Sequence, residues 1–248
     1  MGLAAISYDT PETLKAFAEA RGITFPLLSD RNSETIRRYN ILNQGATGRS
    51  RGIPHPGTFL VDARGIVTAR SFEERYQERA SAASLLSRLP EGAAAGSDSS
   101  RTETHHLILT TSISDRRAPP GTRVSLLLDV VPKPKMHVYA PGQQDMIPIT
   151  LTLTADAAFA AHEPRLPKPE KYFFAPLQET YLVYSSPFRI AQDITIAVTP
   201  EMRKRPAAPG ASLRVSGTLR YQACDDKLCY MPQELPVAWT IELQPMER

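Results

Sequence analysis

The sequence has no long hydrophobic run and no strong excess of charge of either sign. A transmembrane helix needs about 20 consecutive apolar residues, and no segment approaches that length, so we expect no membrane span in this chain. Residues 1–9 lack the basic start and the apolar core of a signal peptide. With 29 basic and 26 acidic residues, the net charge of +3 is too balanced to indicate a nucleic-acid partner.

Several catalytic and metal-binding patterns are also missing. The chain has neither a nucleophile-elbow serine motif nor a glycine-rich phosphate loop. His137 and His162 lack acidic or cysteine partners at the spacing of metal ligands, and His105 and His106 are typical of a strand edge. Two cysteines without a second cluster fall short of a zinc signature. We therefore expect no metal and no dissociable cofactor.

Cysteine is scarce, and both cysteines, Cys224 and Cys229, lie in the short segment 221–232. The residues before and after it, 212–221 and 235–243, alternate apolar and polar with period two, which is typical of half-buried strands. The cysteines are therefore predicted to bracket the turn of a β-hairpin. Fully extended, residues five apart would be separated by roughly 16 Å. A disulfide needs Cα atoms about 5.5 Å apart, so the turn must fold back to close one.

Two interpretations of this pair stay open on the sequence. One is a permanent structural disulfide, and the other is a dithiol that cycles between reduced and oxidised states. Closing so short a loop contributes only about 2 kcal/mol of stability, which slightly favours the redox interpretation. Local charge does not select a nucleophile, because Asp225 and Asp226 disfavour a thiolate whereas Lys227 favours one.

The composition divides the chain into two parts. Residues 92–104 are small, polar and without periodicity, as is typical of a linker. Strands and helices alternate before them, whereas nearly every later segment has the pattern of a strand. We therefore expect an α/β domain at 1–91, a linker at 92–104 and an all-β domain at 105–248, with Trp239 in its core.

The first domain can be divided into individual elements. Residues 3–8 form a short apolar run that predicts a buried strand. Thr10 is the expected cap of a helix that has Pro11 at its first position and ends at Gly22. A second helix, an antiparallel hairpin with glycine in its turn and a closing helix are expected at 33–39, 58–70 and 82–89.

The cysteine segment 221–232 resembles the cysteine hairpin of the N-terminal domain of DsbD, the thiol:disulfide interchange protein. The resemblance covers residues 103–243. It implies an immunoglobulin-like β-sandwich that passes electrons to periplasmic thiol proteins. It also implies that Cys229 is the attacking thiol and that Cys224 resolves the intermediate.

Two further segments fit the same resemblance. Residues 135–139 are similar to the aromatic strand beneath the cysteines of that family, and residues 166–184 to a cap whose aromatic side chain shields the dithiol. On the residues alone, the run 172–174 is more typical of core aromatics. The resemblance marks four residues as candidate shields of the dithiol: Tyr139, Tyr172, Phe173 and Phe174.

The first domain resembles a different family. Residues 6–9, 25–30 and 56–62 occur in the order found in thioredoxin-fold peroxiredoxins of the AhpC/TSA, or redoxin, superfamily. This resemblance spans residues 2–89 and implies a cis-proline before the hairpin strand. Pro56 is the first candidate and Pro54 the second, and the alternative is a rigid turn with no special role.

This sequence departs from the peroxiredoxin pattern. The peroxidatic cysteine would precede the strand at Ile6, but residues 1–91 contain no cysteine, so peroxidase activity is not expected from this chain. A strand of that fold runs between the Ile6 and Phe59 strands. Its absence should either leave backbone groups unpaired or bring those two strands into direct pairing. The simpler hypothesis is that the natural start lies upstream, about 50–80 residues earlier.

Together these features predict a two-domain thiol–disulfide redox protein of the oxidoreductase or antioxidant type. Cys224 and Cys229 would exchange electrons through a mixed disulfide with a thiol- or disulfide-bearing protein partner. The alternative is a non-catalytic binding module in which the same pair is a permanent clamp. The DsbD resemblance implies a periplasmic location, although no export signal is visible in this sequence.

Overall fold

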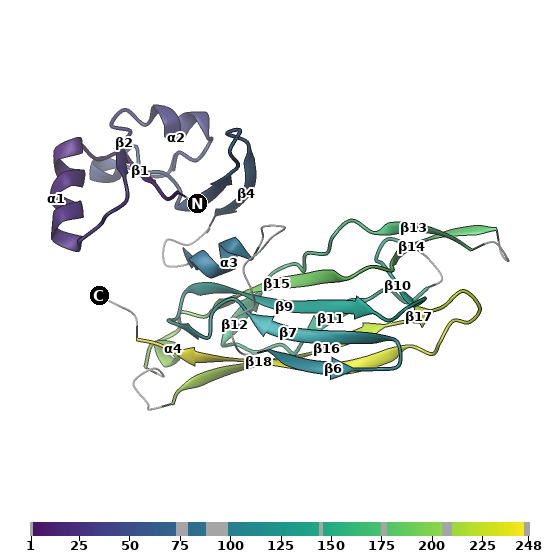
Figure 1. The fold of residues 1–248 in the computed structure, drawn as a ribbon. Coiled ribbons are helices and arrows are strands. Elements are labelled where there is room, and N and C mark those ends of the chain that lie inside the picture. Colours follow the sequence, from purple (N-terminus) through teal and green to yellow (C-terminus); the bar gives the residue numbers. More distant parts are fainter. Residues whose placement is uncertain are drawn as a thin grey trace. The chain divides into compact units, whose positions relative to one another are not determined.

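The computed structural model describes residues 2–72, 79–87, 99–143, 146–174, 178–204 and 210–245. Contacts divide the chain into two compact units, Met1–Tyr76 and Gln77–Arg248. The described part of the chain is mostly β-strand with few helices (Figure 1).

The first unit contains two short pairs of strands and a few helical turns. Parallel pairing joins β1 to β2, and antiparallel pairing joins β3 to β4. In chain order the elements are β1 (Ala5–Ser7), α1 (Pro11–Arg21), β2 (Leu27–Ser29), α2 (Glu34–Arg38), the 3-10 turn η1 (Gly48–Ser50), β3 (Gly57–Val61) and β4 (Val67–Phe72).

The ends of helix α1 follow from its flanking residues. The Thr10 side chain accepts a hydrogen bond from the Thr13 backbone N–H at 3.3 Å, which satisfies a donor that the helix cannot pair internally. Gly22 ends the helix in the left-handed region, with φ 61°, where a side chain would be strained. Both predicted helix boundaries are confirmed.

The two strand pairs of the first unit form separate sheets in the described part of the chain. The direct pairing between the Ile6 and Phe59 strands, one of the two expected outcomes, therefore does not occur there. The hydrophobic core of this unit is small: among its described apolar side chains, Leu14 and Ile36 are buried. Large apolar side chains are exposed on several of its elements: Leu3, Ile6, Phe17, Leu28, Tyr39, Val61, Ile66 and Val67.

The expected cis-proline at Pro56 is not found. All peptide bonds of the described residues are trans, including those before Pro54 and Pro56. A trans bond before proline is favoured by about 0.5–1 kcal/mol, and a cis bond forms only where the surroundings overcome that preference. Pro56 lies immediately before β3, outside its hydrogen-bonded ladder.

The second unit is a β-sandwich with additional short strands. Its elements are β5 (Arg79–Ala80), α3 (Ala82–Leu86), β6 (Ser100–Glu103), β7 (Leu107–Ile113), β8 (Arg117–Ala118), β9 (Thr122–Pro132), β10 (His137–Tyr139), β11 (Thr150–Leu153), β12 (Phe159–Ala161), β13 (Glu170–Phe174), β14 (Glu179–Tyr184), β15 (Phe188–Ile196), α4 (Pro200–Lys204), β16 (Ser212–Tyr221), β17 (Ala223–Cys224) and β18 (Gln233–Leu243). One sheet has the order β12-β15-β9-β7-β6, with β5 pairing to β9, and the second has the order β11-β16-β18-β8.

The sandwich core lies between these two sheets. Alternate residues of β16 and β18 are buried, as their period-two pattern predicts. Trp239 of β18 is 5% exposed, and its indole Nε1 donates a 2.9 Å hydrogen bond to the carbonyl oxygen of Ser112 on β7. This bond joins the sheets through the core and confirms Trp239 as a core residue.

The helix expected to close the first domain, α3, belongs to the second unit. Strand β5 pairs in parallel with β9, and the Ser84 hydroxyl of α3 lies 2.9 Å from the Ser125 hydroxyl. Ser125 in turn donates to Asp193 at 2.6 Å. These buried polar contacts explain why α3 lies beside β9, because hydroxyl groups that leave water need hydrogen-bond partners. Leu89, expected at the end of this helix, lies outside the described residues.

Part of the expected linker forms a strand. Residues Ser100–Glu103 make β6, which pairs antiparallel with β7 although all four of its side chains are exposed. An edge strand of this kind is held by backbone hydrogen bonds, so hydrophobic periodicity does not reveal it. The domain boundaries 1–91, 92–104 and 105–248 stay a prediction.

A third sheet, of order β13-β14-β10-β17, lies at the end of the sandwich opposite α4 (Figure 1). Its last strand, β17, contains Cys224. The third sheet therefore brings the cysteine segment next to strands that are distant in sequence.

Candidate functional site

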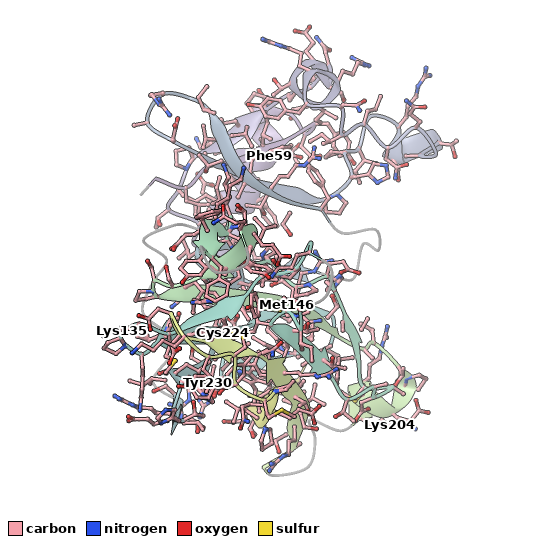
Figure 2. The ribbon with its side chains drawn as sticks, turned by 90° about the vertical axis from the view of Figure 1, so that its right-hand side faces the viewer. Phe59, Lys135, Met146, Lys204, Cys224 and Tyr230 are labelled. Carbon is pink, nitrogen blue, oxygen red and sulfur yellow. A yellow bond between two sulfur atoms is a disulfide. The ribbon has the colours of Figure 1, made fainter. Side chains whose placement is uncertain are left out.

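The two cysteines lie at the tip of the hairpin formed by β16 and β18. The ladder between these strands runs from Ser212 and Glu242 to Tyr221 and Gln233, which confirms the predicted hairpin. Beyond Tyr221 the chain leaves this ladder, and β17 pairs antiparallel with β10 instead. The tip is thus held by the third sheet. Figure 2 shows Cys224 and Tyr230 close together in this segment.

Cys224 and Cys229 form a disulfide, with their Cα atoms 4.1 Å apart. The turn between them folds back, as bonding requires. Their exposure differs sharply: Cys224 is 1% exposed, whereas Cys229 is exposed to solvent. A partner molecule would therefore reach Cys229 first.

The turn is stabilised by Asp225. Its Oδ1 accepts hydrogen bonds from the backbone N–H groups of Lys227 and Leu228, each at 2.7 Å, and its Oδ2 accepts from the Tyr230 hydroxyl at 3.0 Å. The two backbone donors are the main reason that the pKa of Asp225 is lowered. The same carboxylate raises the pKa of Tyr230, because the neutral hydroxyl is the donor.

Tyr139 of β10 lies beneath the disulfide. Its hydroxyl oxygen is 3.1 Å from Sγ of Cys224 and 3.3 Å from Sγ of Cys229. A disulfide sulfur carries no hydrogen, so the Tyr139 hydroxyl is the donor. Burial raises the pKa of this tyrosine, with a smaller contribution from Tyr172, and the hydroxyl keeps its proton.

A small cavity of about 50 Å³ adjoins the disulfide. Its walls come from the third sheet and from the cysteine turn: His137, Tyr139, Met146, Tyr172, Phe174, Tyr181, Cys224, Asp225, Lys227, Leu228 and Cys229.

The structure brings two of the three aromatic residues of β13 to this cavity. Tyr172 and Phe174 line it and pack on a cluster that contains Tyr139 and Cys224. Phe173 is 56% exposed and does not line the cavity, because successive side chains of a strand point to opposite faces. Tyr181 of β14, which the sequence did not single out, lies edge-on to Tyr139 with ring centroids 5.6 Å apart.

His137 is the main residue of the site that sequence reasoning missed. The sequence was searched for a His137 partner only at the spacing of metal ligands, whereas the structure pairs His137 directly with Cys224 in the ladder between β10 and β17. Its ring is tilted against that of Tyr172, with centroids 4.5 Å apart. Since residues two apart in a strand share a face, its position two residues before Tyr139 was a usable signal.

The described residues contain no cluster of three or more His, Cys, Asp or Glu side chains suited to a metal ion. None of the described helices has both the length and the apolar character that crossing a membrane requires.

An exposed cysteine makes a disulfide accessible to thiol–disulfide exchange, so the geometry of this pair fits the thiol–disulfide redox class of sites. The model of the family "Thiol:disulfide interchange protein DsbD, N-terminal" matches residues 106–239, which is more than half of the chain. The chain therefore belongs to the DsbD N-terminal domain family.

The first unit matches a second family. The AhpC/TSA family model covers residues 2–70. Over 65 residues the chain is 42% identical to alkyl hydroperoxide reductase E of Mycobacterium tuberculosis, and equally to that of Mycobacterium bovis. The matched region is 25% of this chain and spans 39% of the length of those relatives. Both family resemblances stated from the sequence are confirmed.

Two solved structures are similar to part of this chain. The N-terminal periplasmic domain of ScsB from Proteus mirabilis has a TM-score of 0.38 and 13% identity, covering 58% of this chain and 51% of that one. The DsbD N-terminal domain of Neisseria meningitidis in the reduced form has a TM-score of 0.31 and 16% identity, covering 47% of this chain and 82% of that one.

Proposed function

We propose that this protein is a thiol–disulfide oxidoreductase that exchanges electrons with a thiol- or disulfide-bearing protein through Cys224 and Cys229. The observation that carries the proposal is the contrast in exposure between the two cysteines, 1% for Cys224 against an exposed Cys229. A permanent clamp needs no accessible sulfur. Attack on a partner disulfide needs one that is accessible and one nearby that can resolve the product.

The exchange runs in two steps. In the reduced protein the Cys229 thiolate attacks a partner disulfide, which forms a mixed disulfide and releases one partner sulfur as a thiolate. The Cys224 thiolate then attacks Sγ of Cys229, re-forms the internal disulfide and releases the second partner sulfur. Two electrons pass to the partner, whose sulfurs take up protons.

The surroundings of the pair suit this chemistry. The Tyr139 hydroxyl is within hydrogen-bonding distance of both sulfurs, so it can donate to a thiolate on either cysteine. The rings of Tyr172 and Phe174 cover the cavity beside the buried cysteine and limit its access to water. We assign the shielding role to these two residues and Tyr139, and not to Phe173, which faces away from the cavity.

For the folds, we propose that the second unit is an immunoglobulin-like sandwich and that the first is part of a thioredoxin-like domain. Two observations support the thioredoxin-like assignment of the first unit. Its elements follow the order β1-α1-β2, with parallel pairing of the two strands, and then the β3–β4 hairpin, and the AhpC/TSA family model matches residues 2–70. Residues 1–91 contain no cysteine, so the exchange is assigned to the second unit alone.

The experiment is the capture of mixed disulfides. Cys224→Ser leaves the exposed Cys229 without its resolving partner, so it should accumulate disulfide-linked proteins that mass spectrometry identifies after non-reducing separation. Cys229→Ser leaves only the buried Cys224 and should capture far fewer. Equal capture by both variants, or none by either, would favour the alternative of a non-catalytic binding module with a permanent clamp.

A further inference from the structure

His137 and Cys224 occupy directly opposed positions of the antiparallel β10–β17 ladder. Side chains opposed in this way project from the same face, with Cβ atoms about 4.5–5.5 Å apart. Both side chains line the cavity beside the disulfide. The imidazole is thus placed beside the buried sulfur of the pair.

His137 is a buried ionisable group with no role in the exchange as described so far. Its side chain is 4% exposed. Burial lowers the pKa of His137, an effect that the negative charge of Asp225 partly offsets. The imidazole is therefore held neutral while the disulfide is intact.

The groups that face His137 come from three elements. From β13, Tyr172 lies against its ring, and from its own strand Tyr139 lies edge-on with centroids 5.8 Å apart. From the cysteine turn, Asp225 and Lys227 line the same cavity with opposite charges. The carboxylate of Asp225 already accepts hydrogen bonds from two backbone N–H groups and the Tyr230 hydroxyl. Among the described residues that line this cavity, Asp225 is the only one with a carboxylate, and these donors already engage it.

Reduction changes this balance, because it creates a second ionisable group beside the histidine. A thiolate on Cys224 would add a negative charge directly opposite His137 in the ladder, and a neighbouring imidazolium favours a thiolate in turn. Resting on the proposed redox function, we propose that His137 is the acid–base group of the site. In the reduced protein it accepts the proton of the Cys224 thiol and holds the resulting thiolate as an ion pair.

The proton is accounted for throughout the cycle. A reducing dithiol of a partner protein opens the disulfide by thiol–disulfide exchange and is itself oxidised to a disulfide. Its two electrons and two protons pass to the cysteines, and the S–H bond formed at Cys224 then breaks as its proton moves to the imidazole of His137. When the Cys224 thiolate attacks Sγ of Cys229 in the mixed disulfide, the imidazolium gives this proton to the departing partner thiolate. The imidazole returns to its neutral state as the internal disulfide forms.

The direct test is an NMR titration of the histidine rings in the full chain, once oxidised and once reduced with a phosphine. The proposal predicts that the midpoint of His137 moves to higher pH on reduction, while those of His55 and His162 do not move. A His137→Phe variant assigns the signal. An unchanged His137 midpoint in protein whose disulfide is verified as open would overturn the proposal.

This test is separable from the proposed function, since a phosphine opens the disulfide without any protein partner. A shift of the His137 midpoint in a protein that captures no partner would support the acid–base role and refute the exchange function. Capture of partners by a protein whose His137 midpoint does not shift would support the exchange function and refute the acid–base role of His137.

A kinetic test uses the same variant. His137→Phe keeps a ring beside Tyr172 but removes the proton acceptor, so resolution of a mixed disulfide made with glutathione should slow by about a hundredfold at neutral pH, the lower end for loss of a general acid–base group. The matched control, His55→Phe, makes the same change at an exposed position of the first unit and should leave the rate unchanged. Equal rates and equal pH profiles for His137→Phe and the unaltered chain would contradict the proposal. If His137→Phe does not fold, sequence-specific NMR assignment of the unaltered chain identifies the His137 signal, and its titration decides.

Discussion

The hydroxyl of Tyr230 donates a 3.0 Å hydrogen bond to Oδ2 of Asp225 and so ties together the two ends of the cysteine turn. Oδ1 of the same carboxylate holds the backbone N–H groups of Lys227 and Leu228. None of these bonds depends on the disulfide. The turn should therefore keep its shape after reduction, with the two sulfurs close enough to reconnect.

The first prediction concerns this preorganisation. Asp225→Ala removes all three hydrogen bonds, so the equilibrium constant for forming the internal disulfide against glutathione should fall several-fold, because the open turn becomes freer to move. The measurement is alkylation of free thiols across a series of glutathione buffers. Asp226→Ala, which removes a neighbouring exposed carboxylate, is the control. Identical equilibrium constants for the two variants would refute a role for Asp225 in shaping the turn.

The second prediction concerns the hydroxyl of Tyr139. Tyr139→Phe keeps the ring but removes the donor that lies 3.1 and 3.3 Å from the two sulfurs. Less thiolate should form at neutral pH, so alkylation of the reduced protein by iodoacetamide should slow by roughly three- to tenfold, the equivalent of one hydrogen bond.

Tyr181→Phe is the matched control for that variant, since it makes the same change within the same aromatic cluster. Its hydroxyl donates to Glu179 and not to a sulfur. Equal alkylation rates for Tyr139→Phe and Tyr181→Phe would show that the hydrogen bond to sulfur has no effect.

The third prediction concerns the pH dependence of stability. Burial lowers the pKa of His137 in the folded, oxidised protein, whereas the unfolded chain has the ordinary value of about 6.5. Between the lowered pKa and that value, the unfolded state binds more protons, so the free energy of unfolding should fall as pH decreases from about 7 to about 5.

His137→Phe should weaken this dependence without abolishing it, because the pKa of His106 is also lowered by burial and contributes with the same sign. Urea unfolding at the two pH values measures the difference. A pH dependence as steep in His137→Phe as in the unaltered chain would exclude this contribution of His137.

The fourth prediction concerns the close approach of β11 and β16. A Cβ atom added at Gly217 would lie 2.6 Å from the backbone carbonyl oxygen of Thr152, which cannot move aside as a flexible side chain could. Gly217→Ala should therefore lower the free energy of unfolding by about 1–3 kcal/mol. Ser216→Ala, at the adjacent half-buried position, is the control for denaturant unfolding, and an equal effect of both changes would contradict the steric account.

Local sequence patterns predicted much of the second unit. The period-two alternation of 212–221 and 235–243 correctly predicted the hairpin with the cysteines at its tip. The alternation says nothing about which distant strand pairs with the tip. The pairing of β17 with β10 joins residues far apart in sequence, so His137 was not connected with Cys224.

The residues predicted to shield the dithiol could also be identified only in part from the sequence. Tyr139 and the 172–174 region were identified through family resemblance, and the structure places Tyr139, Tyr172 and Phe174 at the cavity. Phe173, the fourth candidate, is 56% exposed and is not among the residues that line the cavity, as expected for a side chain on the opposite face of the strand. The position of α3 was also beyond local patterns, because the hydroxyl of Ser84 finds its partner, Ser125, on the distant strand β9.

The reduction potential of the Cys224–Cys229 pair tests the central claim most directly. The protein would be equilibrated in glutathione and dithiothreitol buffers of known potential, and the fraction of free thiols read by mass after alkylation. A pair that exchanges electrons with protein partners should have a midpoint above about −300 mV. A midpoint far below that value would identify a permanent structural disulfide and contradict the account.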